Sequence, residues 1–206
     1  MVWLTLLKRL FSGETRPEAS ELLFVGLGNI GSTYTATRHN IGFRIIDMLA
    51  QRLESRKTGV FAQADYCSGT LFNSTKAVTV KPRTFVNRSG IAVAAYLKAL
   101  HCPLSNALVI VDDYHLPLGA MRARRRGSDG GHNGLASIVN TTGEGFPRLR
   151  IGIGPLPVHS TSVEFVLGAF SKSEEEMLAK VIPRAVDACL CFAKRGIDAV
   201  MNEYNG

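Results

Sequence analysis

Apolar residues along the chain form short continuous runs and longer periodic stretches, and glycine-rich or polar segments separate them. Leu22–Leu27 and Ala107–Val111 are continuous apolar runs, which are typical of strands buried on both faces. From Ile41 onward, apolar residues recur at helical spacing and predict a helix over Asn40–Arg56. Strands that alternate with helices predict a single α/β domain, with a twisted mixed sheet covered by helices on both faces.

The remaining segments continue this alternation. β-branched or alternating residues predict further strands, over Val60–Tyr66, Thr70–Phe72, Lys76–Lys81, Ala120–Arg125 and Leu149–Ile153. Helical periodicity predicts further helices, over Val86–Leu100, His132–Asn140, Ser162–Leu167 and Ser173–Asn205. We expect the last helix to start with a capping box of Ser173 and Glu176, and to break before Pro183.

Residues 1–20 have a different character, and we interpret them as an N-terminal extension and linker before a domain at residues 21–206. The apolar part of Met1–Phe11 is short, and Lys8 and Arg9 interrupt it. A secretory signal would place its positive charge first and a longer apolar stretch after it. We therefore expect no secretory signal. The segment fits a short amphipathic helix, and an organellar targeting remnant is the alternative. The sequence has no apolar run long enough to span a membrane.

The composition describes a basic protein that can build a substantial core. The chain has 206 residues, 46% of them hydrophobic, and a formal net charge of +7. Its 4 cysteines include no C-x-x-C pair, so a reduced compartment is expected, and we predict a cytoplasmic protein. A positive charge suits a phosphate-bearing partner only where it is clustered.

Arginines do cluster near the end of the chain's middle third. Arg122, Arg124, Arg125 and Arg126 lead into a glycine-rich loop, Gly127–Gly134, and Arg148 and Arg150 follow on the next predicted strand. A phosphate-bearing substrate would favour such a row. The simpler alternative is an exposed edge strand that its charges protect from pairing with other strands.

The first strand ends in a turn that matches the dinucleotide-binding pattern G-x-G-x-x-G, with Gly26, Gly28 and Gly31. That pattern requires a helix that begins at the third glycine, so that its amides face a pyrophosphate. Here Ser32–Thr37 is polar and β-branched without an apolar stripe, and it predicts no helix. We therefore expect no nucleotide cofactor, and interpret the turn as one that presents Asn29 at the carboxyl end of the strand.

Polar side chains at the ends of apolar elements suggest a hydrolytic site. Asn29 and Asp112 follow the two most apolar strands and should lie on one rim of the sheet, and the chain returns His39 to that rim. A histidine oriented by a carboxylate is a general base, and asparagine amides can stabilise an oxyanion. Each residue alone has an ordinary structural explanation, such as a turn or a helix cap.

The same region also contains potential metal ligands, namely Asp112, Asp113, His115, His39 and His132. Their spacing is not a recurrent ligand pattern, and no H-E-x-x-H occurs, so we expect no metal. No G-x-S-x-G elbow or suitably placed cysteine supplies a nucleophile. This favours water, activated by histidine, as the attacking group on a reactive bond such as an ester.

Six sequence blocks together resemble bacterial peptidyl-tRNA hydrolase. They occur in the order V-G-L-G-N-I-G (25–31), T-R-H-N-I-G-F (37–43), K-P-R-T-F-V-N-R-S-G (81–90), V-D-D-Y-H-L-P-L-G (111–119), G-G-H-N-G-L (130–135) and R-L-R-I-G-I-G (148–154). The resemblance implies a monomeric α/β enzyme that cleaves the ester between a peptide and the 3′ end of tRNA, and so rescues tRNA during translation. It implies no cofactor and no membrane.

The resemblance also implies a role for each matching residue. His39 matches the base that activates water, and Asp112 matches the carboxylate that orients it. The residues that match substrate-binding positions are Asn29, Tyr34, Val86, Asn87, His132 and Asn133. Arg124 and Arg150 match the basic pair that holds the 5′ phosphate of the tRNA.

Some positions depart from the family's usual residues, among them Ile30, Val86 and Asp129. None of them is the implied base, its carboxylate or one of the three asparagines. Some relatives of this fold are RNA-splicing factors, so an RNA-binding protein without catalytic turnover is the alternative to the hydrolase.

Overall fold

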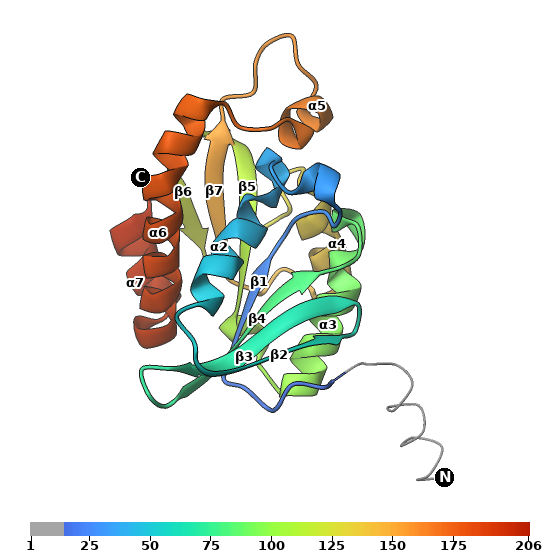
Figure 1. Cartoon of the computed structure of the whole chain (residues 1–206), viewed down its shortest axis with the longest axis vertical. Helices are drawn as coiled ribbons and strands as arrows, with labels where there is room; N and C mark the ends of the chain where they lie inside the picture. Colours follow the sequence, from blue (N-terminus) through green and yellow to red (C-terminus); the bar gives the residue numbers. More distant parts are fainter. Residues whose placement is uncertain (1–14) are drawn as a thin grey trace.

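The computed structural model describes residues 15–206. Figure 1 shows a central sheet with helices between and after its strands; β2, β3 and β4 follow one another directly, and the chain ends in three consecutive helices. The strands are β1 Leu22–Gly26, β2 Glu54–Phe61, β3 Ala64–Leu71, β4 Thr75–Pro82, β5 Ala107–Pro117, β6 Met121–Arg124 and β7 Arg148–Gly154. The α-helices are α2 Ile41–Ala50, α3 Ser89–Leu100, α4 Asn133–Thr142, α5 Ser162–Leu167, α6 Lys172–Arg195 and α7 Ile197–Tyr204. The short 3-10 helices are η1 Ser32–Tyr34, η2 Arg38–Asn40, η3 Val86–Arg88 and η4 Leu104–Asn106.

The described strands form one sheet in the order β2-β3-β4-β1-β5-β7-β6. β1 is parallel to both β4 and β5, and β5 is parallel to β7. β2, β3 and β4 pair antiparallel, as do β6 and β7. The predicted mixed α/β sheet is therefore confirmed, and the polar strand β6 lies at an edge as expected.

Helices cover both faces of the sheet (Figure 1). α2, α6 and α7 pack on one face, against a core that includes Phe24, Ile110 and Phe192. α3 and α4 pack on the other face, where Val25 and Val109 belong to a second core. Alternate residues of β1 and β5 thus supply the two cores, which explains why both strands are continuously apolar.

Several element boundaries differ from the sequence predictions. α2 ends at Ala50, and the segment predicted as its last turns joins β2 instead. β2 and β3 form one hairpin, whose turn at Ala62 and Gln63 has positive φ angles. Neither residue is glycine or asparagine, so the usual signal of a tight turn is missing from the sequence.

The long C-terminal helix also differs from the prediction. Its capping box is formed by Ser171 and Glu174, two residues before the predicted pair. Pro183 lies inside α6 without ending it, and the helix instead ends at Arg195 before Gly196, which has a φ angle of 79°. Glycine is favoured at that position because the left-handed region costs it little.

The expected linker contacts the domain over the residues that the structure describes. The Thr15 amide donates to the Val60 carbonyl oxygen at 3.0 Å, and the Arg16 guanidinium donates to the Ala99 carbonyl oxygen at 3.0 Å. The amphipathic helix predicted for Met1–Phe11 lies outside the described residues. Among the helices of residues 15–206, none is both long and apolar enough to cross a bilayer.

The packing of α2 on the sheet depends on a close approach at Gly42. A Cβ atom there would lie 2.6 Å from the Leu27 carbonyl oxygen and 2.7 Å from the Ile110 carbonyl oxygen. Both neighbours are backbone atoms of the sheet region and cannot move aside cheaply. The absence of a side chain at Gly42 therefore sets how closely the start of α2 approaches the ends of β1 and β5.

We expect Gly42→Ala to lower the free energy of unfolding by about 1–3 kcal/mol, the typical cost of forcing an extra methyl group into a packed interior. Alanine is otherwise the better helix residue, so a loss of stability would have to come from this contact. Chemical denaturation measures the change. Gly145→Ala is the control, since its Cβ would be no nearer than 3.6 Å to another heavy atom. Equal stability of the two variants would contradict the close-packing argument.

Candidate active site

The carboxyl ends of the central parallel strands bring the candidate residues together. Gly26 of β1 is in register with Ile110 of β5, so the turn after β1 and the segment around Asp112 lie at the same edge of the sheet. In parallel sheets this edge is where ligands bind. The loop after η1 then returns the chain to this edge at η2, which carries His39.

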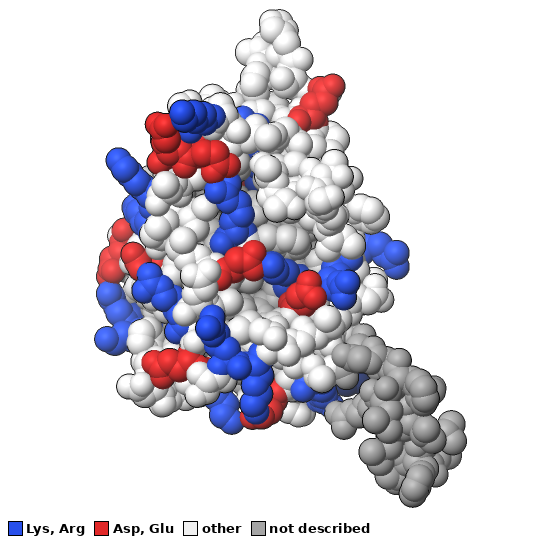
Figure 2. Space-filling view, in the orientation of Figure 1, with Lys and Arg blue, Asp and Glu red and all other residues white. Residues whose placement is uncertain are grey.

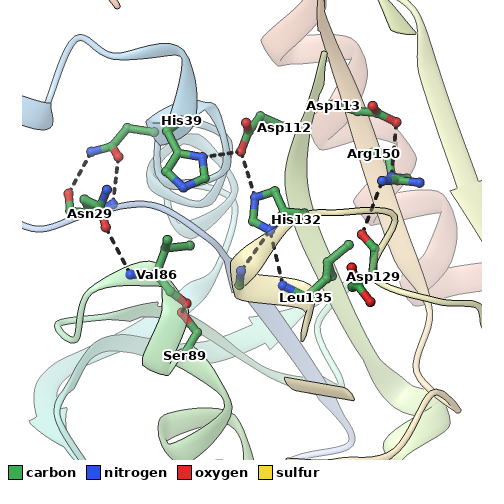
Figure 3. Close-up of polar contacts among 12 residues, drawn as sticks. Asn29, His39, Val86, Ser89, Asp112, Asp113, Asp129, His132, Leu135 and Arg150 are labelled. Atoms are coloured by element: carbon green, nitrogen blue, oxygen red, sulfur yellow. Dashed lines mark hydrogen bonds and ion pairs between the residues drawn. The ribbon is translucent and has the colours of Figure 1, made fainter. Parts of the chain in front are cut away.

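His39 is held by the carboxylate of Asp112 (Figure 3). The distance from His39 Nδ1 to Asp112 Oδ1 is 2.8 Å, and both side chains are buried. An ionised carboxylate only accepts hydrogen bonds, so Nδ1 carries the hydrogen and neutral His39 has its lone pair on Nε2. Nε2 points away from Asp112 and has no hydrogen-bond partner among residues 15–206. This is the tautomer that a general base requires.

His132 makes a second hydrogen bond to the same carboxylate oxygen. Its Nδ1 caps α4 by accepting from the amides of Gly134 and Leu135, at 3.1 and 3.2 Å. Nε2 therefore carries the hydrogen and donates to Asp112 Oδ1 at 3.1 Å. Both ring nitrogens of His132 are thus occupied, and in this conformation the residue orients its neighbours and cannot itself accept a proton.

The pKa values follow from this arrangement. Burial acts to raise the pKa of Asp112, but the charges and hydrogen bonds of His39 and His132 outweigh it and hold that pKa well below its usual range. Burial acts to lower the pKa of His39, but the Asp112 charge and hydrogen bond together outweigh it and raise that pKa above its ordinary value of 6.5. The pair therefore combines an ionised carboxylate with a strengthened base.

His39, Asp112 and His132 also have the composition of a metal site, because one ligand atom of each lies within 4.8 Å of the others. The positions of the imidazole N–H groups argue for a hydrogen-bonded network in place of a metal site. Both imidazoles direct an N–H group at Asp112, and the other nitrogen of His132 faces the start of α4. A cation would have to displace both hydrogen bonds, so the donor set fits a carboxylate-centred network better than a metal.

Asn29 lies on the side of His39 away from Asp112 in Figure 3, and three hydrogen bonds hold it. Its backbone N–H and carbonyl group pair with the side-chain amide of Asn40, at 2.8 and 2.9 Å. Its own Oδ1 accepts from the Val86 amide at 3.0 Å. Because the amide oxygen is occupied, the NH2 group of Asn29 is the part that remains to donate, and it has no hydrogen-bond partner among the described residues.

A pocket opens beside His39 and contains about half of the predicted site residues. Its lining includes the predicted residues His39, Asp112, His132, Asn133 and Arg150. Ser162, Val163 and Val166 of α5 form another part of its wall. Half of the predicted site residues thus lie together around His39 and Asp112.

The other predicted residues lie outside the lining of this pocket. Asn29 lines a neighbouring hollow with Asn40. Val86 is buried below Gly134, and Asn87 is exposed on η3. Tyr34 is half-buried on η1, where its backbone amide donates to the Gly31 carbonyl oxygen at 3.1 Å. Of the three predicted asparagines, Asn133 therefore lines the pocket with His39, whereas Asn29 and Asn87 do not. Asn29 is hydrogen-bonded to Asn40, the residue after His39.

The predicted arginines Arg124 and Arg150 lie on neighbouring strands but are not directly opposite each other. Arg150 lines the pocket, and its Nε lies 3.1 Å from Asp113 Oδ2, whereas Arg124 is exposed on β6. Arg150 is opposite Arg122, and Arg124 is opposite Arg148. Arg124 and Arg150 are therefore diagonal neighbours across β6 and β7, where long side chains can still reach a common group.

Arg148, which belongs to the same cluster, is structural. It is 2% exposed and donates to the carbonyl oxygens of Gly127, Ser128, Glu144 and Phe146. Burial, with a smaller effect of the Arg150 charge, lowers the pKa of Arg148 to about 10, so the side chain stays charged at neutral pH. Arg148 thereby fixes the start of the glycine loop.

The glycine loop passes directly over Arg150. A Cβ atom at Gly130 would lie 2.5 Å from Arg150 Nη2, and the φ angles of Gly130 and Gly131 are 60° and 81°. The Asp129 side chain accepts from the Gly131 amide at 2.7 Å and so stabilises the turn. These glycines serve close approach and left-handed geometry, which places His132 above Asp112.

The basic charge is not concentrated on the face that carries α2. Figure 2 shows Lys and Arg side chains interspersed with Asp and Glu over this face. Two ion pairs connect this region to α6. Arg44 of α2 pairs with Glu175, and Arg38 of η2 pairs with Glu174. Arg38 and Asn40, which the sequence did not indicate as site residues, hold predicted residues in place, and so does Asp113, which the sequence indicated only as a potential metal ligand.

The chain is similar to known proteins over nearly its whole length. The family model described as "Peptidyl-tRNA hydrolase" matches residues 23–206. The peptidyl-tRNA hydrolase of Syntrophomonas wolfei is 44% identical over 185 residues, which cover 89% of this chain and 99% of that protein. The peptidyl-tRNA hydrolase of a Synechococcus strain is 43% identical over 195 residues, covering 91% of this chain and 84% of that protein.

A solved structure agrees with these sequence matches. The crystal structure of peptidyl-tRNA hydrolase from Acinetobacter baumannii superimposes with a TM-score of 0.83 at 29% identity, covering 93% of this chain and 98% of that chain. The comparisons favour the hydrolase over an RNA-binding protein without turnover. With a matching family model and relatives above 40% identity over most of both chains, this protein belongs to the peptidyl-tRNA hydrolase family of enzymes.

Proposed function

We propose that this enzyme hydrolyses the ester bond between peptide and tRNA in peptidyl-tRNA, with His39 as the general base. The observation that carries the mechanism is the 2.8 Å hydrogen bond from His39 Nδ1 to Asp112, which leaves Nε2 free to accept a proton. Direct attack by water forms no covalent intermediate with the enzyme. It is assisted best by a general base whose pKa is near neutral pH. The raised pKa of His39 suits that role.

The reaction proceeds through attack by water on the ester carbonyl carbon. His39 Nε2 removes a proton from the water as its oxygen bonds to the carbonyl carbon, and a tetrahedral oxyanion forms. The intermediate then expels the 3′ oxygen of the tRNA, and the imidazolium returns the proton to that oxygen. Asp112 stabilises the imidazolium in between, because its carboxylate is ionised and already hydrogen-bonded to the ring.

Neutral amides would bind the peptide part of the substrate. The NH2 group of Asn29 is left to donate by its contact with the Val86 amide, and it suits the ester or peptide carbonyl. Asn133 lines the pocket beside His39, and Asn87 lies exposed on η3, which packs against α4. We assign these asparagines, with Tyr34, Val86 and His132, to substrate binding.

Arg124 and Arg150 would hold the 5′ phosphate of the tRNA. Two guanidinium groups on adjacent strands offer planar, paired donors to a phosphate. In this conformation Asp113 holds the Arg150 side chain, so phosphate binding would compete with that ion pair. Through this reaction the enzyme would return tRNA to translation, and we expect it to act in the cytoplasm as a monomer.

Replacing the base should abolish most turnover and leave binding intact. For His39→Ala we expect the rate of ester cleavage to fall by about 10²–10⁴-fold, the usual contribution of a general base. Affinity for peptidyl-tRNA should change little and can be measured by filter binding. His101→Asn is the control, because His101 ends α3 in a left-handed conformation that asparagine tolerates. Near wild-type cleavage by His39→Ala would refute the assignment.

Replacing the carboxylate should change the pH dependence of the reaction. Since Asp112 raises the pKa of His39, wild-type kcat/KM should rise through a midpoint above pH 6.5 as His39 loses its proton. Asp112→Asn removes the negative charge, so the midpoint should move to lower pH while the plateau falls. A pH–rate profile from pH 5 to 9 measures both effects. An unchanged midpoint would argue against the direct pairing of these residues during catalysis.

Removing a phosphate contact should weaken substrate binding and leave the chemical step unaffected. For Arg124→Ala we expect KM to rise severalfold with kcat unchanged, and the slope of log kcat/KM against log salt to become shallower by roughly 0.7–0.9. Arg52→Ala, at an exposed position after α2, is the matched control. A loss in kcat alone would contradict the phosphate-binding role.

A further inference from the structure

Arg38 directly precedes the proposed base and makes an unusual number of contacts for an arginine on a short turn. Its Nη1 donates to the Ala169 carbonyl oxygen at 2.5 Å, and its Nη2 lies 3.0 and 2.8 Å from the two carboxylate oxygens of Glu174. The guanidinium also lies 4.6 Å from the ring centroid of Phe165 and 5.1 Å from that of Phe170. All these partners belong to α5, to the start of α6 or to the segment between them.

The backbone around Arg38 is attached to the same segment. The Arg38 amide donates to the Gly168 carbonyl oxygen at 3.0 Å, and Thr37 forms an isolated antiparallel bridge with Ala169. The chain just before His39 is therefore joined to residues 168–169 by backbone bonds as well as by the Arg38 side chain. These contacts link parts of the sequence about 130 residues apart.

The residue after His39 is held just as firmly on the opposite side. Asn40 makes its two hydrogen bonds to the backbone of Asn29, in the turn after β1. η2 is one turn long, so its two outer residues are attached to different parts of the protein and His39 lies between them. A side chain in such a position can shift only if one of these attachments gives way.

The segment that Arg38 holds also forms part of the pocket. Ser162, Val163 and Val166 of α5 line it together with His39 and Asp112. The Phe165 ring, on the same helix, packs against the guanidinium. The position of the α5 residues relative to His39 in this pocket therefore depends on Arg38.

We propose that Arg38 is a positioning residue that fixes His39 and the α5 wall of the pocket relative to each other. The proposal rests on the function proposed above, since it takes His39 as the base. Arg38 does not touch the reacting atoms. It acts by holding the Nε2 atom of His39 at the distance from the bound ester that proton transfer requires, and small displacements of such a group are costly in rate.

The chain supplies a matched control in Arg44. This residue makes a similar paired contact with the next acid of α6, with Arg44 Nη1 and Nη2 lying 2.9 and 2.7 Å from the carboxylate oxygens of Glu175. It joins α2 to the same turn of α6, but no hydrogen bond joins it to residues 162–169 among the contacts of the described chain. The two arginines thus differ chiefly in their attachment to the pocket wall.

The experiment compares Arg38→Gln, Arg44→Gln and Glu174→Gln in the full chain, with N-blocked aminoacyl-tRNA as substrate. We expect Arg38→Gln to lower kcat by roughly 10–100-fold, and to move the acid limb of the pH–rate profile to lower pH as His39 loosens from Asp112. Glu174→Gln should cause a smaller loss of the same kind, and Arg38→Lys should recover part of the rate. Arg44→Gln should keep wild-type kcat and the wild-type pH profile.

Several outcomes would overturn the proposal. One is a wild-type kcat and pH profile for Arg38→Gln, and another is an equal loss for Arg44→Gln, which would mean that any ion pair with α6 matters equally. If Arg38→Gln does not fold, Glu174→Gln decides between the same alternatives. Failure of the proposed function looks different, because His39→Ala would then still cleave the ester, or the wild-type enzyme would not.

Discussion

The site depends on one buried carboxylate that accepts two hydrogen bonds. Asp112 is 2% exposed, and a charge in such a place is tolerated only when donors surround it. Its donors, His39 and His132, come from η2, just before α2, and from the loop before α4. The carboxylate therefore joins three segments that are far apart in the sequence, and each histidine has its tautomer set by that contact. If the charge were lost, both rings would lose a charge-assisted hydrogen bond, and His39 would lose the contact that sets its tautomer.

Each histidine is also held in place by the α-helix that follows it. The Nδ1 atom of His132 satisfies two free amides of α4, so the ring can offer Asp112 only its other nitrogen. His39 lies on the turn that leads into α2, and Gly42 lets that helix approach the strand ends. Packing thus determines which atoms face the carboxylate. The low pKa of Asp112 therefore depends on how α2 and α4 pack at the carboxyl edge of the sheet, because that packing directs the N–H groups of His39 and His132 at the carboxylate.

Much of the fold could be predicted from the sequence, because β1 and β5 are buried on both faces and appear as continuous apolar runs. The hairpin of β2 and β3 could not, because its turn lacks the usual glycine or asparagine. The choice of capping box was ambiguous for a different reason. Ser171 with Glu174 and Ser173 with Glu176 fit the same pattern, and the pair that forms the box is the one whose glutamate also pairs with Arg38.

The contact between His39 and Asp112 could also be predicted. Asp112 follows a central apolar strand, which places it at the carboxyl edge of the sheet, and the chain after the first strand returns His39 to the same edge. The arginines were harder to assign, because composition does not specify the register between two strands. Arg148 and Arg150 are two residues apart and look equivalent in the sequence. The structure buries the first under the glycine loop and leaves the second in the pocket. Arg148 differs from Arg150 because backbone carbonyl groups at the start of the glycine loop and just before β7 accept its hydrogen bonds, and this arrangement depends on the tertiary structure.

The glycines of the first turn have a structural role different from that of a nucleotide-binding loop. A Cβ atom at Gly26 would lie 2.4 Å from the Gly42 carbonyl oxygen, and one at Gly28 would lie 2.8 Å from Asn40 Oδ1. The space that a pyrophosphate would need is thus filled by α2 and by the side chain that holds Asn29. In dinucleotide-binding proteins this glycine spacing makes room for a phosphate. In this protein it lets α2 and the Asn40 side chain approach the backbone of the turn. The turn therefore positions the amide of Asn29 and the ring of His39, which lies one residue before Asn40.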